Sequence, residues 1–256
     1  ISNKNTMLNI FKFFKPDLVI NLAAQAGVRH SLKYPEKYLR DNIKGFLNIL
    51  ELSKLYSVKK VIYASSSSIY GRNKSPFQEK NNTDKQIQFY AVTKKTNELM
   101  AHTWSSLYGI QTIGLRFFTV YGPWGRPDMA LYKFVSNICN DKTIELFNNG
   151  DHVRDFTYID DIINGITSAI KFNFRDYHNK NLKIFNKVPS IVVNLGSGRN
   201  ITLMNFLGVI ERNLNKKAIV KHLPMQKGDI HTSLADLTLA KKLFNYRPKT
   251  KPEEGI

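Results

Sequence analysis

Apolar and polar positions alternate along the chain in blocks that predict strands and helices in turn. Short, nearly continuous apolar runs at Leu18–Leu22 and Val61–Ala64 are typical of strands that are buried on both faces. Between them, apolar residues at helical spacing predict a helix over Pro35–Leu55. The same pattern predicts further helices and one further strand: Thr6–Phe14, Tyr90–Leu107 and Ala130–Cys139 as helices, and Thr112–Phe118 as a strand. This alternation predicts an α/β fold with a doubly wound parallel sheet.

The second half of the chain has a less regular pattern. Short apolar runs and helical periods are mixed there: strands at Ile144–Phe147 and Ile191–Leu195, and helices near Ile159–Ile170, Leu203–Leu214 and Leu237–Leu243. Lys171–Pro189 is polar and rich in Lys and Asn, which is typical of a surface loop. We therefore expect a second, smaller α/β lobe built from segments of this half.

Composition narrows the class of protein. The net charge is +18, but Lys is spread along the whole chain, so we expect no nucleic-acid partner. No apolar run approaches the roughly 18 residues of a membrane span, and the first residues do not resemble a signal peptide. The single cysteine, Cys139, excludes an intramolecular disulfide, and no Cys/His cluster has metal-ligand spacing. These features predict a soluble cytoplasmic protein without a bound metal.

The first candidate for chemistry is a serine run at a strand end, followed later by Tyr90 and Lys94. Residues four apart on a helix lie on one face, so Tyr90 and Lys94 point into the same space. A nearby ammonium favours the phenolate and lowers a tyrosine pKa from its usual value of about 10. The Ser66 hydroxyl, at the carboxyl end of a neighbouring strand, could orient a substrate oxygen.

Six ordered motifs give these residues a context. They are Asn21–Arg29 (NLAAQAGVR), Ala64–Gly71 (ASSSSIYG), Tyr90–Lys94 (YAVTK), Leu115–Pro123 (LRFFTVYGP), Arg126–Ala130 (RPDMA) and Arg154–Asp161 (RDFTYIDD). In this order they resemble the extended short-chain dehydrogenase/reductases, an NAD-dependent epimerase/dehydratase family, and most closely its UDP-glucuronate 4-epimerases. The resemblance covers nearly the whole chain and implies a Rossmann-type fold.

The resemblance implies a role for each matching position. Tyr90 would be the general base and acid, Lys94 would tune it and bind the nicotinamide ribose, and Ser66 would assist them. Other positions would contact the NAD cofactor: Ala23, Ala24, Gln25, Asn42 and Phe117, beside Tyr90 and Lys94 themselves. The implied reaction is oxidation of a UDP-sugar at C4, rotation of the 4-keto sugar, and reduction of its other face.

The substrate follows from the same resemblance. A 4-keto uronic acid is a β-keto acid and loses CO₂ readily, so an epimerase must hold its carboxylate; Ser67, Ser68 and Thr119 would supply hydroxyl donors. The related dehydratases carry an Asp-Glu pair where Ser67 and Ser68 stand here, which argues against dehydratase chemistry. The predicted reaction is UDP-glucuronate to UDP-galacturonate. UDP-glucose or UDP-N-acetylhexosamine epimerisation, UDP-glucuronate decarboxylation, and non-catalytic nucleotide-sugar binding stay open as alternatives.

Several basic and aromatic residues resemble the family's substrate contacts. Arginine forks suit diphosphate oxygens, and of Arg29, Arg126 and Arg154 the last is the strongest candidate for the pyrophosphate. Lys133 and Phe147 would line the uridine end, and Asp229 would lie near the ribose. The family also implies a homodimer of the full-length protein, formed by the helices Pro35–Leu55 and Tyr90–Leu107.

The chain departs from the family at its start. None of its 14 glycines forms the G-x-x-G-x-x-G or G-x-G-x-x-G fingerprint of a dinucleotide site. We therefore expect that roughly 80 residues, about one βαβαβ unit, are missing before Ile1. Residues 1–122 would form a partial NAD-binding domain, and 123–256 mainly the sugar lobe, with segments near 150–165 and 190–200 returning to the first domain. Leu18–Leu22 would then be an edge strand, and the chain alone would bind NAD weakly, aggregate and be inactive.

Overall fold

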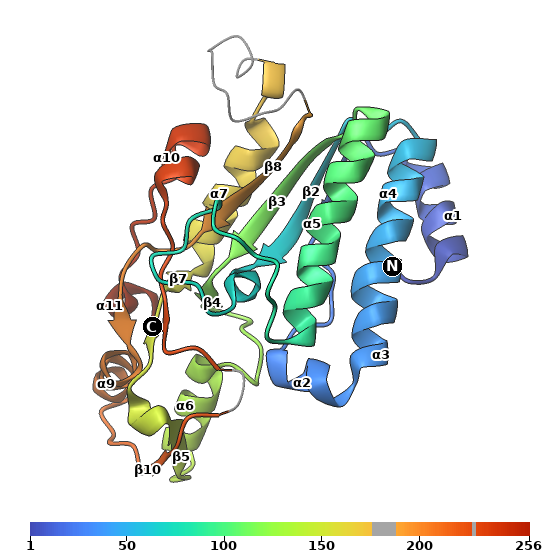
Figure 1. Ribbon diagram of the computed structural model, residues 1–256. Coiled ribbons are helices and arrows are strands. Elements are labelled where there is room, and N and C mark those ends of the chain that lie inside the picture. The colour runs from blue at the N-terminus through green and yellow to red at the C-terminus, as the bar shows by residue number, and fades with distance from the viewer. Residues whose placement is uncertain (176–187, 227–228) are drawn as a thin grey trace. The chain divides into compact units, whose positions relative to one another are not determined.

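The computed structural model describes residues 1–175, 188–226 and 229–256. Figure 1 labels its helices and strands. They group into two compact units. Unit 1 comprises Ile1–Gly71, Glu79–Arg116 and Thr167–Val193, and unit 2 comprises Arg72–Gln78, Phe117–Ile166 and Asn194–Ile256. These units group residues by contacts, and their boundaries differ from the predicted functional division at residue 122. That functional division stays a prediction.

Unit 1 carries the doubly wound part of the fold. Its elements are α1 (Lys4–Phe14), β1 (Leu18–Asn21), α2 (Val28–Lys33), α3 (Pro35–Tyr38), the π-helical η1 (Leu39–Lys44), α4 (Gly45–Leu55), β2 (Lys60–Ser66), the 3-10 helix η2 (Ser67–Tyr70), α5 (Phe89–Tyr108) and β3 (Gln111–Phe117). The main sheet has the order β1-β2-β3-β8, where β8 is Ser190–Leu195. The predicted α/β fold of Rossmann type is confirmed.

The outer strand of this sheet is β1. It pairs in parallel with β2, with Leu18 opposite Lys60 and Asn21 opposite Tyr63. It lies at one end of the four-stranded sheet, so the prediction of an edge strand is confirmed. Burial on both faces was expected for this run, but Ile20 is 39% exposed and Leu22, just beyond the strand, is 48% exposed. An edge strand is paired on one side only, so its side chains have fewer neighbours and stay partly exposed to solvent.

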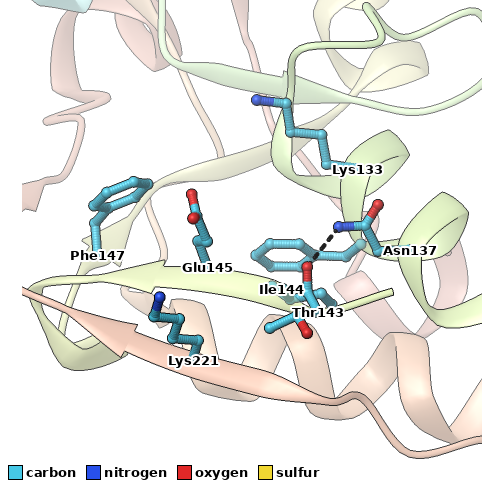
Figure 2. A pocket seen from close by; sticks show the side chains of 8 residues that line it. Lys133, Asn137, Thr143, Ile144, Glu145, Phe147 and Lys221 are labelled. Carbon is cyan, nitrogen blue, oxygen red and sulfur yellow. Dashed lines mark hydrogen bonds between the residues drawn. The ribbon is translucent and has the colours of Figure 1, made fainter. Parts of the chain in front are cut away.

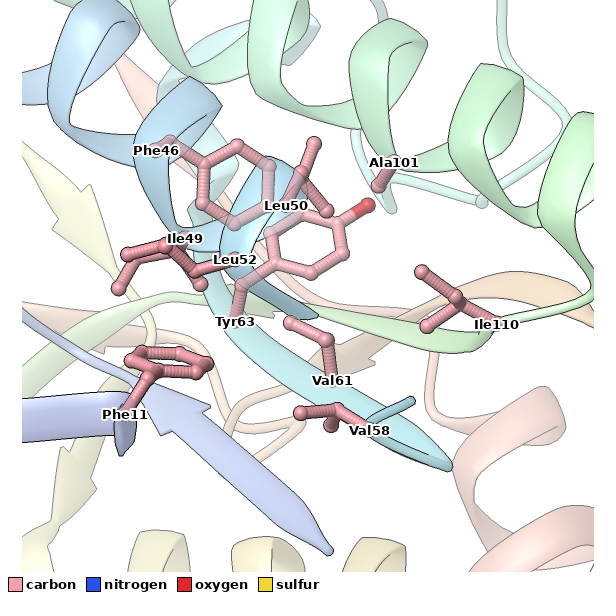
Figure 3. Close-up of a cluster of buried hydrophobic side chains, with 10 residues drawn as sticks. All are labelled: Phe11, Phe46, Ile49, Leu50, Leu52, Val58, Val61, Tyr63, Ala101 and Ile110. Carbon is pink, nitrogen blue, oxygen red and sulfur yellow. The ribbon is translucent and has the colours of Figure 1, made fainter. Parts of the chain in front are cut away.

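Unit 1 is held together by an apolar cluster between β2 and helices α1, α4 and α5. Figure 3 shows its side chains: Phe11, Phe46, Ile49, Leu50, Leu52, Val58, Val61, Tyr63, Ala101 and Ile110. The cluster holds α5 against β2, and α5 also packs on η2. Because Tyr90 and Lys94 lie on α5 and the serine run ends β2, this packing brings the predicted catalytic elements together.

The predicted single helix Pro35–Leu55 is interrupted. It begins as α3 and ends as α4, but Leu39–Lys44 between them is π-helical. A π-helical turn accommodates one extra residue and is frequent at functional sites. Here it turns Asn42 inward, where the side chain is 1% exposed. The helix departs from the prediction because the Asn42 amide bonds the loop after β1.

Unit 2 is built from short parallel and antiparallel pairs with helices around them. Its strands are β4 (Thr119–Tyr121), β5 (Ile144–Phe147), β6 (Val153–Arg154), β7 (Phe156–Tyr158), β9 (Ile201–Thr202), β10 (Val220–Leu223) and β11 (Thr232–Ser233). Its helices are α6 (Ala130–Cys139), η3 (Asn148–Gly150), α9 (Leu203–Leu214), α10 (Thr238–Phe244) and α11 (Pro252–Gly255), while α7 (Ile159–Lys171) begins in this unit. The predicted helices and strands of the second half are thus present, within about a residue at their ends.

The core of unit 2 is aromatic. Phe156 of β7 and Phe206 of α9 stack with ring centroids 3.9 Å apart, and Tyr121 of β4 meets both rings edge-on. This cluster ties the β4–β7 pair to α9. Residues 176–187 of the predicted loop Lys171–Pro189 lie outside the described residues. No helix within the described ranges is long and apolar enough to cross a membrane.

Candidate active site

Tyr90 and Lys94 lie in the first two turns of α5, as the spacing predicted. The Tyr90 backbone N–H donates to Ser31 Oγ of α2 (3.1 Å), which satisfies one of the first amides of the helix. Lys94 Nζ lies 5.9 Å from the centroid of the Tyr90 ring. Tyr38 of α3 meets the Tyr90 ring edge-on at 6.2 Å. The predicted pairing of a phenol with an ammonium is therefore present on one face of α5.

Lys94 is buried, with 3% of its surface exposed, and its Nζ donates to the Ala64 carbonyl of β2 (2.8 Å). Burial lowers the pKa of the Lys94 ammonium to about 8. A positive charge held near the phenol in a partly dehydrated site favours the phenolate. Lys94 therefore remains mostly charged at neutral pH and can lower the pKa of a neighbouring acid.

The serine run starts at the carboxyl end of β2. Ser66 caps the 3-10 helix η2: its Oγ accepts the Ser68 N–H at 3.2 Å. Ser66 Oγ also lies 3.2 Å from Ser68 Oγ. Ser67 and Ser68 form the first residues of η2 and are partly exposed. The strand end thus presents three consecutive hydroxyls, one of them fixed by capping.

The loop after β1 contains the predicted cofactor contacts Ala23, Ala24 and Gln25. Asn42 holds this loop: its Oδ1 accepts the Gln25 N–H (2.7 Å) and its Nδ2 donates to the Gln25 carbonyl (3.0 Å). The same Nδ2 also donates to Thr93 Oγ1 of α5 (3.0 Å). Ala23 and Ala24 are exposed beside this clamp. Asn42 therefore bonds protein groups with both ends of its amide and fixes the loop, a role that the sequence did not show.

Arg154, on β6 in unit 2, is anchored by Asp229. Arg154 Nη2 donates to Asp229 Oδ1 (2.9 Å), and its Nη1 donates to the His231 carbonyl (2.9 Å). Burial lowers the pKa of Arg154, and the Asp229 charge opposes that shift. The guanidinium is thus a partly desolvated cation whose orientation is fixed by these hydrogen bonds. The sequence placed Arg154 and Asp229 in the same site, and the structure brings them into contact.

Two carboxylates of the RDFTYIDD run, Asp155 and Asp161, have structural roles. Asp155 is fully buried, and its carboxylate accepts the N–H groups of Gly198 and Ala235 (3.0 and 3.1 Å). Asp161 accepts the N–H groups of Lys249 and Thr250 (3.1 and 3.0 Å). These carboxylates bind neighbouring loops to the β6–β7–α7 segment. The run therefore stabilises the backbone that carries Arg154.

A cavity of about 520 Å³ lies between α6, β5 and β10 in unit 2. It is lined by Lys133, Phe134, Asn137, Thr143, Ile144, Glu145, Phe147 and Lys221. Figure 2 shows Lys133, Glu145 and Phe147 on the same side of β5. The structure therefore brings the predicted Lys133 and Phe147 to one cavity. Sequence reasoning missed Glu145 and Lys221, which are cross-strand partners in the β5–β10 pair.

A second cavity in unit 2, of about 380 Å³, brings together the predicted Thr119 and Arg126. Its other lining is mostly apolar: Tyr121, Met129, Phe156 and Phe206 among others. Arg126 makes a two-bond ion pair with Asp128 (2.9 and 2.7 Å), and Arg126 lowers the pKa of that carboxyl. The Thr119 backbone N–H donates to the Asp155 carbonyl (3.1 Å).

Two predicted residues remain, Arg29 and Phe117. Arg29 is an exposed residue of α2 in unit 1, and Phe117 ends β3 and begins the second segment of unit 2. In the part of the chain that the structure describes, no group of three or more His, Cys, Asp or Glu side chains could hold a metal ion.

Comparison with known proteins places this geometry in a family. The family model for the NAD dependent epimerase/dehydratase family matches residues 1–185. The uncharacterized protein MJ1055 of Methanocaldococcus jannaschii is 51% identical over 241 residues, which cover 94% of this chain and 70% of that protein. A UDP-glucuronate 4-epimerase of Thermodesulfobacterium geofontis is 40% identical over 100% of this chain and 75% of its own length.

A solved structure agrees with these relatives. The UDP-glucuronic acid 4-epimerase of Bacillus cereus, in complex with UDP-glucuronic acid and NAD, superposes with a TM-score of 0.85. It is 30% identical, over 97% of this chain and 75% of that one. The chain belongs to the NAD dependent epimerase/dehydratase family. The predicted family, the NAD cofactor and the enzyme class are thereby confirmed.

Proposed function

We propose that the protein inverts C4 of a UDP-sugar in an NAD-dependent reaction, and that its substrate is UDP-glucuronate. The observation that carries the proposal is the Tyr90–Lys94 pair on α5, in which a buried ammonium lies 5.9 Å from the centroid of the phenol ring. The relatives add support, because those with an assigned reaction include UDP-glucuronate 4-epimerases.

The residues present fit the nicotinamide half of NAD. Ala23 and Ala24 are small, exposed and follow the carboxyl end of β1, where open α/β sheets bind ligands. The Asn42 clamp holds the backbone of Gln25 beside them. When bound there, NAD would supply hydride acceptance and return at C4.

The chain's own part of the chemistry is proton transfer. Tyr90 takes the proton of the O4 hydroxyl as C4 is oxidised, and it returns a proton to O4 when the rotated 4-keto sugar is reduced. Lys94 favours the phenolate form that accepts the proton. Ser66 hydrogen-bonds O4 and orients it toward the phenol. The protein therefore ends each turnover in the protonation state in which it began.

The uridine diphosphate would bind in unit 2. The cavity lined by Lys133 and Phe147 has a volume of about 520 Å³, within the range of small-molecule sites. Phe147 can stack on a base, and Lys133 can donate to its oxygens. Arg154 offers a guanidinium fork that suits the diphosphate, with Asp229 holding its orientation.

Thr119 and Arg126 line one cavity of unit 2 and would hold the glucuronate carboxylate there. Ser67 and Ser68, in unit 1, are assigned to this carboxylate by the family resemblance alone. Arg126 pairs with Asp128, but both side chains are about half exposed, 43% and 57%. An exposed ion pair contributes only about 0–1 kcal/mol, so a substrate carboxylate can replace Asp128 at little cost. Donors that hold the carboxylate would keep the β-keto acid from releasing CO₂. This set favours epimerisation over decarboxylation.

We expect the full-length protein to prefer UDP-glucuronate over UDP-glucose, by about 10-fold or more in kcat/KM. A site built to pair a carboxylate leaves donors unpaired when the substrate lacks one. The two sugars are mixed in one NMR-monitored reaction, and their C4-inverted products are followed together. Equal rates would favour a UDP-glucose epimerase, a pentose product would favour a decarboxylase, and binding without conversion would favour a nucleotide-sugar binder.

We also propose a homodimer of the full-length protein, formed by the α3–α4 region and α5. The outward face of α5 carries exposed apolar residues at Val92 (37%), Leu99 (58%) and Leu107 (65%), at helical spacing. Apolar side chains exposed along one face of a helix can mark an interaction site. Light scattering at micromolar concentration should give twice the subunit mass, and Leu99→Glu should lower it toward the subunit mass. A monomeric wild-type protein would rule out this interface.

A further inference from the structure

The helix that carries Tyr90 and Lys94 also carries an acidic residue, Glu98, one turn beyond Lys94. Tyr90, Lys94 and Glu98 occupy positions i, i+4 and i+8 of α5 and so share one face. Glu98 is buried, with 7% of its surface exposed. Its Oε1 accepts the Ser65 hydroxyl of β2 at 2.6 Å. Ser65 lies between Ala64, whose carbonyl accepts Lys94, and Ser66.

Glu98 also binds Arg116 of β3 through two parallel bonds. Arg116 Nε donates to Glu98 Oε1 (2.9 Å), and Nη2 donates to Oε2 (2.8 Å). Arg116 in turn donates from Nη1 to the hydroxyl of Tyr70 (2.9 Å) and lies 4.9 Å from the centroid of its ring. Tyr70 is the last residue of η2, which begins with Ser67 and Ser68.

The hydrogen bonds of Glu98 and Arg116 therefore hold both ends of the segment Ser65–Tyr70. Ser65 is held directly by Glu98, and Tyr70 is held by Arg116, which Glu98 binds. Ser66, Ser67 and Ser68 lie between these two points. The grip on Ser65 also fixes the neighbouring Ala64 carbonyl, the acceptor of the Lys94 ammonium.

Stability alone is a weak reason for such a group. The desolvation of a buried ion pair offsets much of its attraction, and apolar residues of similar volume often stabilise a fold equally well. Apolar side chains cannot fix the direction of a hydroxyl or of a carbonyl, whereas the bidentate carboxylate–guanidinium pair does so. The pair lies one turn beyond Lys94 and beside the serine run, so it fixes these directions next to the predicted catalytic residues.

We propose that Glu98 is a positioning residue for proton transfer by Tyr90, acting through Ser65 and through Arg116 and Tyr70. It aligns Ser66 with the substrate hydroxyl and keeps the Lys94 ammonium beside the phenol. The inference rests on the proposed function only in assigning the proton transfer to Tyr90.

Ser65→Ala tests the link without exposing the buried charges, because the Glu98–Arg116 pair stays intact. Glu98→Gln is less informative, since it leaves the Arg116 charge unpaired and can prevent folding. In the NAD-loaded, full-length enzyme, Ser65→Ala should lower kcat about 10-fold, equivalent to about 1.4 kcal/mol, with KM changed less than about twofold. Tyr70→Phe should have a smaller effect in the same direction.

A second readout does not depend on turnover. In protein labelled with ¹³Cζ-tyrosine, the Tyr90 resonance is assigned by its loss in Tyr90→Phe and titrated with pH. We expect Ser65→Ala to raise the pH at which Tyr90 ionises, because a displaced ammonium stabilises the phenolate less. Thr112→Val is the matched control: it removes the hydroxyl of a buried residue at the other end of β3, which donates to Ser190 Oγ (2.8 Å).

The outcomes separate the two proposals. A lower melting temperature for Ser65→Ala, with kcat and the Tyr90 titration as in Thr112→Val, would show that the network is structural only and would overturn the inference. A shifted Tyr90 titration supports it even if the wild-type enzyme converts a different UDP-sugar. Normal turnover by Tyr90→Phe would instead refute the proposed mechanism, and the positioning role with it.

Discussion

Arg154→Leu in the full-length protein is expected to raise the KM for the UDP-sugar about 10²-fold while kcat changes little. Hydrogen bonds to charged groups contribute about 1.5–3 kcal/mol each, and about 1.4 kcal/mol corresponds to a factor of ten in affinity. A diphosphate lies away from the reacting carbon, so its contacts are made equally in the ground state and the transition state. Loss of such uniform binding raises KM and leaves kcat.

Two further variants make this test specific. Arg154→Lys keeps the positive charge but loses the two-pronged donor, so its KM should lie between those of the wild type and Arg154→Leu. Arg212→Leu removes an exposed arginine near the end of α9. It tests whether the loss of one positive charge from the net +18 changes the KM by itself. Steady-state kinetics and calorimetric titration with UDP give both constants. A KM within about threefold of the wild type in Arg154→Leu would show that the diphosphate binds elsewhere.

The parts of the fold that depend on local pattern could be predicted from the sequence. The buried run of β2 and the long apolar face of α5 are local signals, and the four-residue spacing alone places Tyr90 and Lys94 on one face of the helix. The motifs then supplied the family. These signals are strong because strand burial and helix periodicity are properties of consecutive residues.

The partners across the fold could not be predicted in the same way. Arg154 and Asp229 are 75 residues apart, and Glu98 meets Arg116 from a different element. Nothing in the local pattern of either residue specifies such a contact. The π-helical turn at Leu39–Lys44 was missed for a related reason: the hydrophobic period of Pro35–Leu55 suits a regular helix, and the bonds of Asn42 to Gln25 and Thr93 override it.

The predicted roles of the site residues differ in how far the structure supports them. Asn42 was predicted to contact NAD. In the structure its amide points into the protein and holds the loop after β1. Arg126 lines the cavity with Thr119 but is already paired with Asp128. The carboxylate-binding role of this group therefore stays a proposal, tested by the competition between UDP-glucuronate and UDP-glucose.

Tyr90→Phe in the full-length protein is expected to lower the rate of C4 inversion by about 10²–10⁴-fold, the usual contribution of a positioned general acid–base. The substitution removes one oxygen and keeps the ring that meets Tyr38 edge-on, so the fold around α5 should be unchanged. Binding of UDP should also be nearly unchanged, since the uridine and diphosphate contacts are proposed for unit 2. The loss should therefore appear in kcat and not in affinity.

Tyr108→Phe is the matched control, because it removes a phenol oxygen from the same helix, 18 positions away, where the residue is 43% exposed. The decisive measurement is the NMR rate of C4 inversion in the wild type, Tyr90→Phe and Tyr108→Phe, each saturated with the UDP-sugar that the wild type converts. We expect normal inversion in Tyr108→Phe and a loss of at least about 10²-fold in Tyr90→Phe, with UDP affinity retained. Inversion at a near-normal rate in Tyr90→Phe would contradict the assignment of Tyr90 as the proton-transferring group.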